Sequence, residues 1–187
     1  MSAPHPLAER LIKRLQSRPQ SRVLDFAAGH GRNAEALRRA GFCVVAVGDD
    51  TAESETPIPN APQPFTAALS THGLLHGTPA AIAARLSAIA QNLHGGGLLY
   101  ATFGSTSDRR FGKGARVDDF TFVPLDGDER GILHAYFDRD ALLGVLQREF
   151  QIEELAETCA DDTAGAWAHR ERPLRGAVHW FAIAHKR

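Results

Sequence analysis

Apolar residues recur at helical spacing in several parts of the chain. Between residues 5 and 17 they occupy positions 7, 11, 12 and 15, and a proline at position 6 suits a first helical turn. A second stripe follows Thr78 and Pro79 and continues through Ile82, Leu86 and Ile89, as in an amphipathic helix with a capped start. The pattern predicts helices over residues 5–17, 31–40, 79–93 and 138–149.

Short apolar runs alternate with these helices. The runs at 23–26 and 42–47 enclose the helix at 31–40, with connections of only a few residues. A strand, a helix and a strand joined in this way form a parallel unit with a right-handed crossover. Further runs predict strands over residues 65–70, 98–103, 120–124, 132–137, 150–156 and 176–185. We therefore expect one α/β domain over residues 1–187, opened by a helix and linker over residues 1–20.

The stretch RVLDFAAGHGRNAEAL joins the first strand to its helix through a turn of small residues. Gly29 and Gly31 would let the backbone approach a ligand closely, and free N–H groups at the helix N-terminus favour electronegative atoms. Asp25, at the end of the strand, can accept hydrogen bonds from ligand hydroxyls or amines. Arg32 and Asn33 open the helix, where they would contact a ligand carboxylate or stay solvated. The alternative is a structural turn, in which Asp25 is only a cap and the glycines only permit packing.

The overall composition narrows the class of protein. The chain has 187 residues, 43% of them hydrophobic, which is enough for one domain with a substantial core. Its 21 basic and 22 acidic residues give a net charge of -1, so no general attraction to nucleic acid or to a membrane surface is expected. We expect no signal peptide and no membrane-spanning run. Two distant cysteines, Cys43 and Cys159, form no disulfide framework, which favours a cytoplasmic location.

The order of elements and the motif Asp25-x-Ala27-x-Gly29-x-Gly31 resemble the class I S-adenosylmethionine-dependent methyltransferases. The later segments FGKG, HAYFD and WFAIAHK are similar to a subgroup of small bacterial enzymes related to tellurite-resistance and thiol methyltransferases. The resemblance implies a Rossmann-like, doubly wound, mostly parallel sheet with an antiparallel C-terminal strand. It also implies that S-adenosylmethionine is bound, and S-adenosylhomocysteine formed, at Asp25, Ala27, Gly29, Gly31, Arg32, Asn33, Asp49, Asp50, Ser70 and Thr71.

Three places depart from the family pattern. Ala27 replaces the usual first glycine, and Gly48 stands where an acidic residue would bind the ribose hydroxyls, so Asp49 or Asp50 is expected to serve instead. The proline-rich residues 51–64 are too few for a crossover helix and a further strand. We therefore expect an abbreviated third-strand region. The shortened sheet edge could pair with a second copy of the chain as a homodimer.

Histidines follow the strand at 65–70, where folds of this kind bind ligands. His72 is a candidate for substrate binding, and His76 is a candidate catalytic group that could relay a proton. As a metal pair they lack a third ligand, so no metal is predicted. His134 and Tyr136 share one face of a strand and are candidates for a general base and an orienting hydroxyl. If that face is turned to the core, they are structural polar groups instead.

The region 104–137 starts with a polar, basic stretch and is expected to act as a loop or lid over the site. Arg109, Arg110, Lys113 and Arg116 fall within eight residues of one another. Arg110 and Lys113 are the predicted substrate contacts and would suit an anionic small molecule. The alternative is a solvated loop whose charge is partly neutralised by nearby aspartates.

We expect a methyltransferase that acts on a small molecule. Methyl transfer from a sulfonium depends on positioning, so the lack of a nucleophilic triad excludes nothing. One alternative is a non-catalytic relative, a binding module with a reduced cofactor pocket. The other is a nicotinamide-dependent oxidoreductase, because Gly29-x-Gly31-x-x-Ala34 fits the dinucleotide fingerprint and Asp49 or Asp50 follows about twenty residues later.

Overall fold

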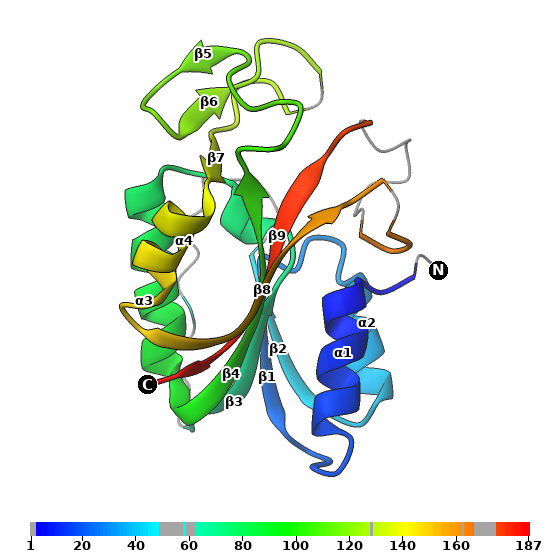
Figure 1. The fold of residues 1–187 in the computed structure, drawn as a ribbon. Coiled ribbons are helices and arrows are strands. Elements are labelled where there is room, and N and C mark those ends of the chain that lie inside the picture. The colour runs from blue at the N-terminus through cyan, green and yellow to red at the C-terminus, as the bar shows by residue number, and fades with distance from the viewer. Residues whose placement is uncertain (1–2, 49–57, 59–62, 128, 162, 167–174) are drawn as a thin grey trace.

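A computed structural model describes residues 3–48, 58, 63–127, 129–161, 163–166 and 175–187. Its main sheet has the strand order β2–β1–β3–β4–β9–β8, in which β2, β1, β3 and β4 are parallel and β9 runs antiparallel to both neighbours (Figure 1). These strands are β1 (Arg22–Phe26), β2 (Cys43–Val47), β3 (Phe65–Ser70), β4 (Leu93–Ser105), β8 (Phe150–Cys159) and β9 (Val178–Lys186). The predicted α/β fold, mostly parallel with an antiparallel C-terminal strand, is confirmed.

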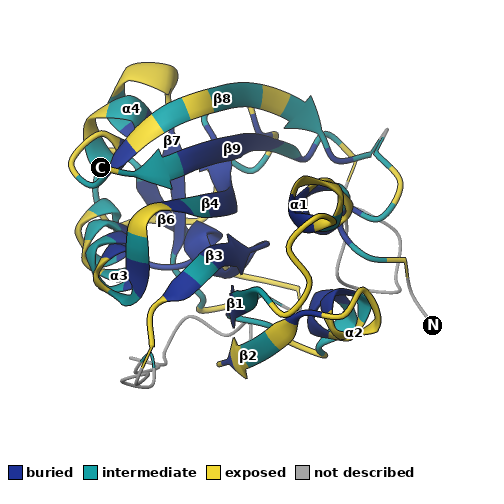
Figure 2. Cartoon of the chain, turned by 90° about the horizontal axis from the view of Figure 1, so that it is seen from below, coloured by how far each residue is buried: buried dark blue, intermediate teal, exposed yellow. Residues whose placement is uncertain are grey.

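The helices form a layer on each side of the sheet (Figures 1 and 2). On one side lie α1 (Pro6–Leu15) and α2 (Arg32–Arg39), and on the other lie α3 (Pro79–Asn92) and α4 (Arg139–Leu146). None of the helices among the described residues is long and apolar enough to cross a membrane.

The starts of α1, α3 and α4 each have a local cause in the sequence. The Thr78 side chain accepts a hydrogen bond from the Ala81 N–H at the start of α3, and Asp138 does the same for α4. These are the caps that the sequence predicts. The start of α1 uses a less common cap, because His5 accepts from the N–H of Leu7 through its side chain.

Among the described residues, the two large apolar clusters of the core lie one on each side of the sheet. On the α3 and α4 side, Ile82, Leu86 and Leu142 pack with strand residues such as Leu24. On the other side, Leu7, Leu11 and Leu15 of α1 pack with a second set that includes Val23. Because successive residues of β1 enter opposite clusters, the central strands are buried on both faces, as expected for a parallel sheet.

The structure corrects the predicted start of β4. A strand was expected only over residues 98–103, after the helix at 79–93, but β4 begins at Leu93, directly after α3, and includes Gly95, Gly96 and Gly97. The pairing of β3 with β4 shifts register between Phe65 and Ala67, as at a bulge, which accommodates the glycine segment. Strand β8 also extends beyond its predicted end, to Cys159.

The region 104–137 forms a small antiparallel sheet beyond the end of β4. It contains β5 (Ala115–Arg116), β6 (Thr121–Val123) and β7 (His134–Phe137), and β7 pairs in parallel with the last residues of β4. This unit stands at the carboxyl end of the parallel strands (Figure 1). Most of residues 51–64 lie outside the described part of the chain, and in the described part no strand separates β2 from β3.

Candidate active site

The glycine-rich turn lies at the carboxyl end of β1, next to the end of β3. Gly29 and Gly31 both adopt left-handed conformations, with φ of 52° and 74°, and Gly31 is the N-cap of α2. A Cβ at Gly31 would meet no atom within 4 Å among the described residues. The first turn of α2 therefore has no side-chain cap and open space beside it, which leaves its N-terminal N–H groups suited to a ligand.

Asp25 is a buried carboxyl group with one unused oxygen. The residue is 1% exposed, and the Ala34 N–H donates a hydrogen bond to it. Its Oδ2 has no hydrogen-bond partner among the described residues. Burial raises the pKa of Asp25 to about 7, against the opposing effects of the Ala34 hydrogen bond and the charges of Arg38 and Arg32. A ligand with a donor group could satisfy this oxygen.

Two residues other than glycine adopt left-handed backbone conformations at the same edge. Ala27 has φ of 56° and His72 has φ of 73°, where a side chain costs about 1–2 kcal/mol. Gly73 begins the short 3-10 helix η1 (Gly73–Leu75) and packs on Ala27, because a Cβ at Gly73 would lie 2.2 Å from the Ala27 Cβ. The alanine in place of the family's glycine is thus matched by a glycine opposite it.

The predicted cofactor residues after the turn have partners inside the protein. Asn33 accepts from the His5 backbone N–H at 2.9 Å and donates to the Thr71 hydroxyl at 2.8 Å. Arg32 donates to the Ala3 carbonyl at 3.0 Å, rather than standing free in solvent. By contrast, the buried Ser70 hydroxyl has no partner among the described residues. Asn33 and Arg32 therefore tie the N-terminal segment to the site, while Ser70 and Asp25 keep polar atoms available.

His5, His72 and His179 form a row of buried rings beside this turn. The ring centroids of His5 and His72 are 5.8 Å apart, those of His72 and His179 are 5.5 Å apart, and both pairs are T-shaped. Burial lowers the pKa of His5 to about 2 and that of His179 to about 3, with smaller effects from neighbouring charges. Both rings are therefore neutral near pH 7.

A second pair of histidines lies at the start of β7. His76 and His134 face each other across an antiparallel bridge, and their rings are 4.8 Å apart at 82°. The ring of Tyr136 stacks on that of His134 at 6.4 Å, so the prediction that these two residues share a face is confirmed. All three are buried, and burial raises the pKa of Tyr136 above its usual value. His72 and His76, four residues apart, thus belong to separate clusters on either side of η1.

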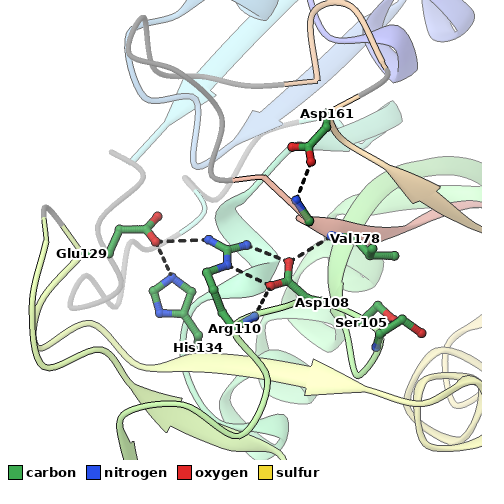
Figure 3. A network of polar contacts seen from close by, with 9 residues as sticks. Ser105, Asp108, Arg110, Glu129, His134, Asp161 and Val178 are labelled. Carbon is green, nitrogen blue, oxygen red and sulfur yellow. Dashed lines mark hydrogen bonds and ion pairs between the residues drawn. The ribbon is translucent and has the colours of Figure 1, made fainter.

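A network of carboxylates and a guanidinium lies next to His134 (Figure 3). Arg110 donates through Nε and Nη2 to the two oxygens of Asp108, each at 2.9 Å. The Val178 N–H donates to the same aspartate at 3.0 Å, which links the network to β9. Arg110 Nη1 and His134 Nε2 both lie 3.3 Å from Glu129 Oε2. The ion-pair contact with His134, followed by the nearby charge of Arg110, outweighs burial and lowers the pKa of Glu129 to about 2.

The structure brings some of the predicted residues together and leaves others apart. His76, His134, Tyr136 and Arg110 converge, but the charge of Arg110 is already balanced by two carboxylates, so its role in binding an anionic substrate stays a prediction. Lys113 is exposed in the turn before β5. Asp49 and Asp50 lie outside the described residues.

Sequence reasoning missed three residues of the site. Glu129 sits in the turn DGDERG, which carries no motif, and Asp108 looked like one of several loop aspartates. His5 contributes both a helix cap and a buried ring, and the only available signal was a histidine directly before the first-turn proline. Each depends on contacts between segments far apart in the chain.

No protein-family model matches this chain, and no curated protein matches it either. Solved structures do match over nearly its whole length. The 1,6-didemethyltoxoflavin-N1-methyltransferase of Burkholderia thailandensis, solved with 1,6-didemethyltoxoflavin and S-adenosylhomocysteine, is 20% identical with a TM-score of 0.65, over 97% of this chain and 76% of that one. A SAM-dependent methyltransferase of Methanosarcina mazei is 14% identical with a TM-score of 0.70, over 98% of each chain.

A third match is the magnesium protoporphyrin IX methyltransferase of Synechocystis PCC 6803 with bound SAM, which is 12% identical with a TM-score of 0.58, over 96% of this chain and 78% of that one. At these identities the similarity shows the fold, which is that of the class I SAM-dependent methyltransferases. It gives no support to the narrower subgroup of tellurite-resistance and thiol methyltransferases.

Proposed function

We propose that the protein is a S-adenosylmethionine-dependent methyltransferase that acts on a small-molecule acceptor in the cytoplasm. The observation that carries the proposal is the buried Asp25, whose Oδ2 has no partner among the described residues, beside a left-handed glycine turn in a methyltransferase-like fold. A buried polar atom of this kind is rare unless water or a ligand satisfies it.

The residues at the carboxyl ends of β1 and β3 fit the cofactor. Asp25 and Ser70 provide buried polar atoms without partners among the described residues, and Gly31 provides a backbone position with room for a ligand beside it. The Thr71 hydroxyl already accepts a hydrogen bond from Asn33, so Thr71 would support the turn rather than offer a free hydroxyl to the cofactor. When bound, the cofactor supplies an electrophilic methyl group. Asp49 or Asp50 would complete the ribose side of the site.

The acceptor side is the cluster around β7. His76, His134 and Tyr136 place three polar side chains in a largely apolar environment, where they could orient a small molecule for attack on the methyl carbon. His72 and Lys113 are further contacts that we predict for the acceptor. The solved methyltransferases of similar fold include enzymes named for small-molecule acceptors, which supports this class of substrate.

The two alternatives differ from this proposal in sheet topology or in ligand binding. A dinucleotide-binding oxidoreductase has a mostly parallel sheet of the order 3-2-1-4-5-6, whereas here the antiparallel β9 lies between β4 and β8. A binding module without cofactor would bind neither nucleotide. It could still use the edge of β2 to form the homodimer, a proposal that sedimentation of the purified protein can test.

Calorimetry with S-adenosylmethionine and S-adenosylhomocysteine tests the proposal directly. We expect dissociation constants in the micromolar range, as for typical substrates. Asp25→Asn should weaken binding about tenfold or more, the value of a hydrogen bond to a charged group, whereas Asp126→Asn, at an exposed position, should not. No binding at millimolar ligand would favour the binding module, and quenching of tryptophan fluorescence by NADH would favour the oxidoreductase.

A further inference from the structure

Three side chains of the kinds that bind metals meet on the acceptor side of the site. One ligating atom each from His76, Glu129 and His134 lies within 4.8 Å of the other two. His76 is 7% exposed and His134 2% exposed, and Glu129 is partly buried. The residues come from the turn after η1, the start of β7 and the turn before it. Two distant histidines with a carboxylate could not be recognised as a set from their spacing.

The proton on the His134 ring is fixed by its backbone contact. Nδ1 lies 2.9 Å from the carbonyl oxygen of Ile132, and because a carbonyl only accepts, Nδ1 must carry the proton. In the neutral ring Nε2 then has a lone pair and no proton. Yet Nε2 lies 3.3 Å from Glu129 Oε2, which is also an acceptor, and it has no hydrogen-bond partner among the described residues. Two acceptors this close require a cation between them, either a proton or a metal ion.

The spacing of these atoms suits a metal ion. Ions of the zinc type bind histidine nitrogen and carboxylate oxygen at about 2.0–2.2 Å. Two such ligands at octahedral or tetrahedral angles are therefore about 2.8–3.6 Å apart, and the 3.3 Å between His134 Nε2 and Glu129 Oε2 already falls there. The ligating atom of His76 lies within 4.8 Å of the other two, so it would move closer to them when an ion binds. The Ile132 carbonyl on Nδ1 is the backbone support that metal-binding histidines commonly have.

The charges around the cluster also allow a divalent cation. Arg110 is held by Asp108 through two hydrogen bonds and also lies 3.3 Å from Glu129. One guanidinium between two carboxylates leaves one net negative charge, and the two histidines contribute none while neutral. A divalent ion would leave a net charge of one on the set, the usual result for two histidines and a carboxylate.

We propose that His76, His134 and Glu129 bind a divalent transition-metal ion of the Zn²⁺, Co²⁺ or Fe²⁺ class. Two imidazole ligands favour these ions over Mg²⁺ and Ca²⁺, which prefer oxygen ligands. Three protein ligands leave the remaining positions to water or to an acceptor with oxygen or nitrogen donors. The site is independent of the cofactor turn, so the proposal does not require the methyltransferase activity.

Titration of the untagged, chelator-treated protein with Co²⁺ tests the site through the visible absorption of the bound ion. We expect one equivalent to bind, and Zn²⁺ to displace it. Glu129→Gln has nearly the same shape without the charge and should weaken binding by at least about 100-fold, because even supporting residues of metal sites contribute 10–100-fold. His76→Ala should do the same. His94→Ala, in a histidine at the far end of β4, is the matched control and should bind as the unmodified protein does.

Two results would overturn the proposal. One is the absence of Co²⁺ and Zn²⁺ binding at millimolar metal, which would mean that a proton on His134 joins it to Glu129 as an ion pair. The other is equal binding by the unmodified protein and Glu129→Gln, which would place the ion elsewhere in the chain. Neither result depends on S-adenosylmethionine, and calorimetry with the cofactor would separately decide the proposed function.

Discussion

The clearest physical prediction concerns Asp25 and the dependence of stability on pH. Burial raises the pKa of this carboxyl from 3.8 to about 7 in the folded protein. The difference is 7 minus 3.8, or about 3 pH units, and each unit corresponds to about 1.4 kcal/mol. The folded state therefore disfavours the ionised carboxyl by up to about 4 kcal/mol relative to the unfolded chain.

The sign follows from which state holds the proton. Below about pH 4, Asp25 is protonated in both states and contributes no pH dependence. Between about pH 4 and 7 the folded protein keeps a proton that the unfolded chain has lost, so the free energy of unfolding falls by about 1.4 kcal/mol per pH unit. Above about pH 7 the carboxyl is ionised in both states, and the full loss of about 4 kcal/mol remains.

Asp25→Asn removes this titration with little change of shape, because the amide oxygen can still accept from the Ala34 N–H. We expect the stability of the variant relative to the unmodified protein to increase steadily from about pH 4 to 7 and then to stay constant. Urea unfolding of both proteins over this range gives the difference, in which the other titrating groups cancel. Asp126→Asn is the matched exposed control. If the difference for Asp25→Asn were the same at both ends of the range, the burial argument would be refuted.

Two further predictions concern local contacts. Gly73→Ala places a methyl group 2.2 Å from the Cβ of Ala27 and should cost about 1–3 kcal/mol, whereas Gly95→Ala, with no atom within 4 Å, should cost much less. In an Ala27→Gly background, which also relieves the left-handed φ of 56°, Gly73→Ala should be tolerated, and equal losses in both backgrounds would contradict the pairing. Asp138→Ala removes the acceptor for the Ala141 N–H and should lower the free energy of unfolding by about 1 kcal/mol, measured by urea unfolding.

The elements that the sequence predicts best are those with local causes. Strand β3 was expected at residues 65–70 and occupies the same residues, because its apolar run is bounded by prolines and a polar turn. Helix α3 follows its cap and its apolar stripe closely. The start of β4 was mispredicted, because glycines normally end helices, whereas here Leu93 already pairs with Phe65 of β3 and the glycines lie in the irregular segment before Leu98 pairs with Ala67. That pairing is tertiary and leaves no local signal.

In the candidate site too, the residues that the sequence indicated are those within one short segment. Asp25, Gly29 and Gly31 could be identified because one short segment contains the strand end, the turn and the helix start. The cluster of His76, Glu129 and His134 could not, because it forms only when β7 pairs with the end of β4 and brings a turn more than fifty residues away beside η1. The sequence therefore indicated the proposed cofactor side of the site in more detail than the proposed acceptor side.

Several residues around the glycine turn have unfavourable energies, which bears on whether the protein binds a ligand there. If the protein only maintained its own fold, burying the Asp25 carboxyl would be a disadvantage, because it costs up to about 4 kcal/mol of stability near neutral pH. Apolar groups of similar size usually serve stability as well or better. Ala27 and His72, in left-handed conformations, add about 1–2 kcal/mol each at the same place. Unfavourable features of this kind gather at functional sites. The proposed cofactor would account for their concentration around the glycine turn, whereas a binding module without a cofactor offers no such account.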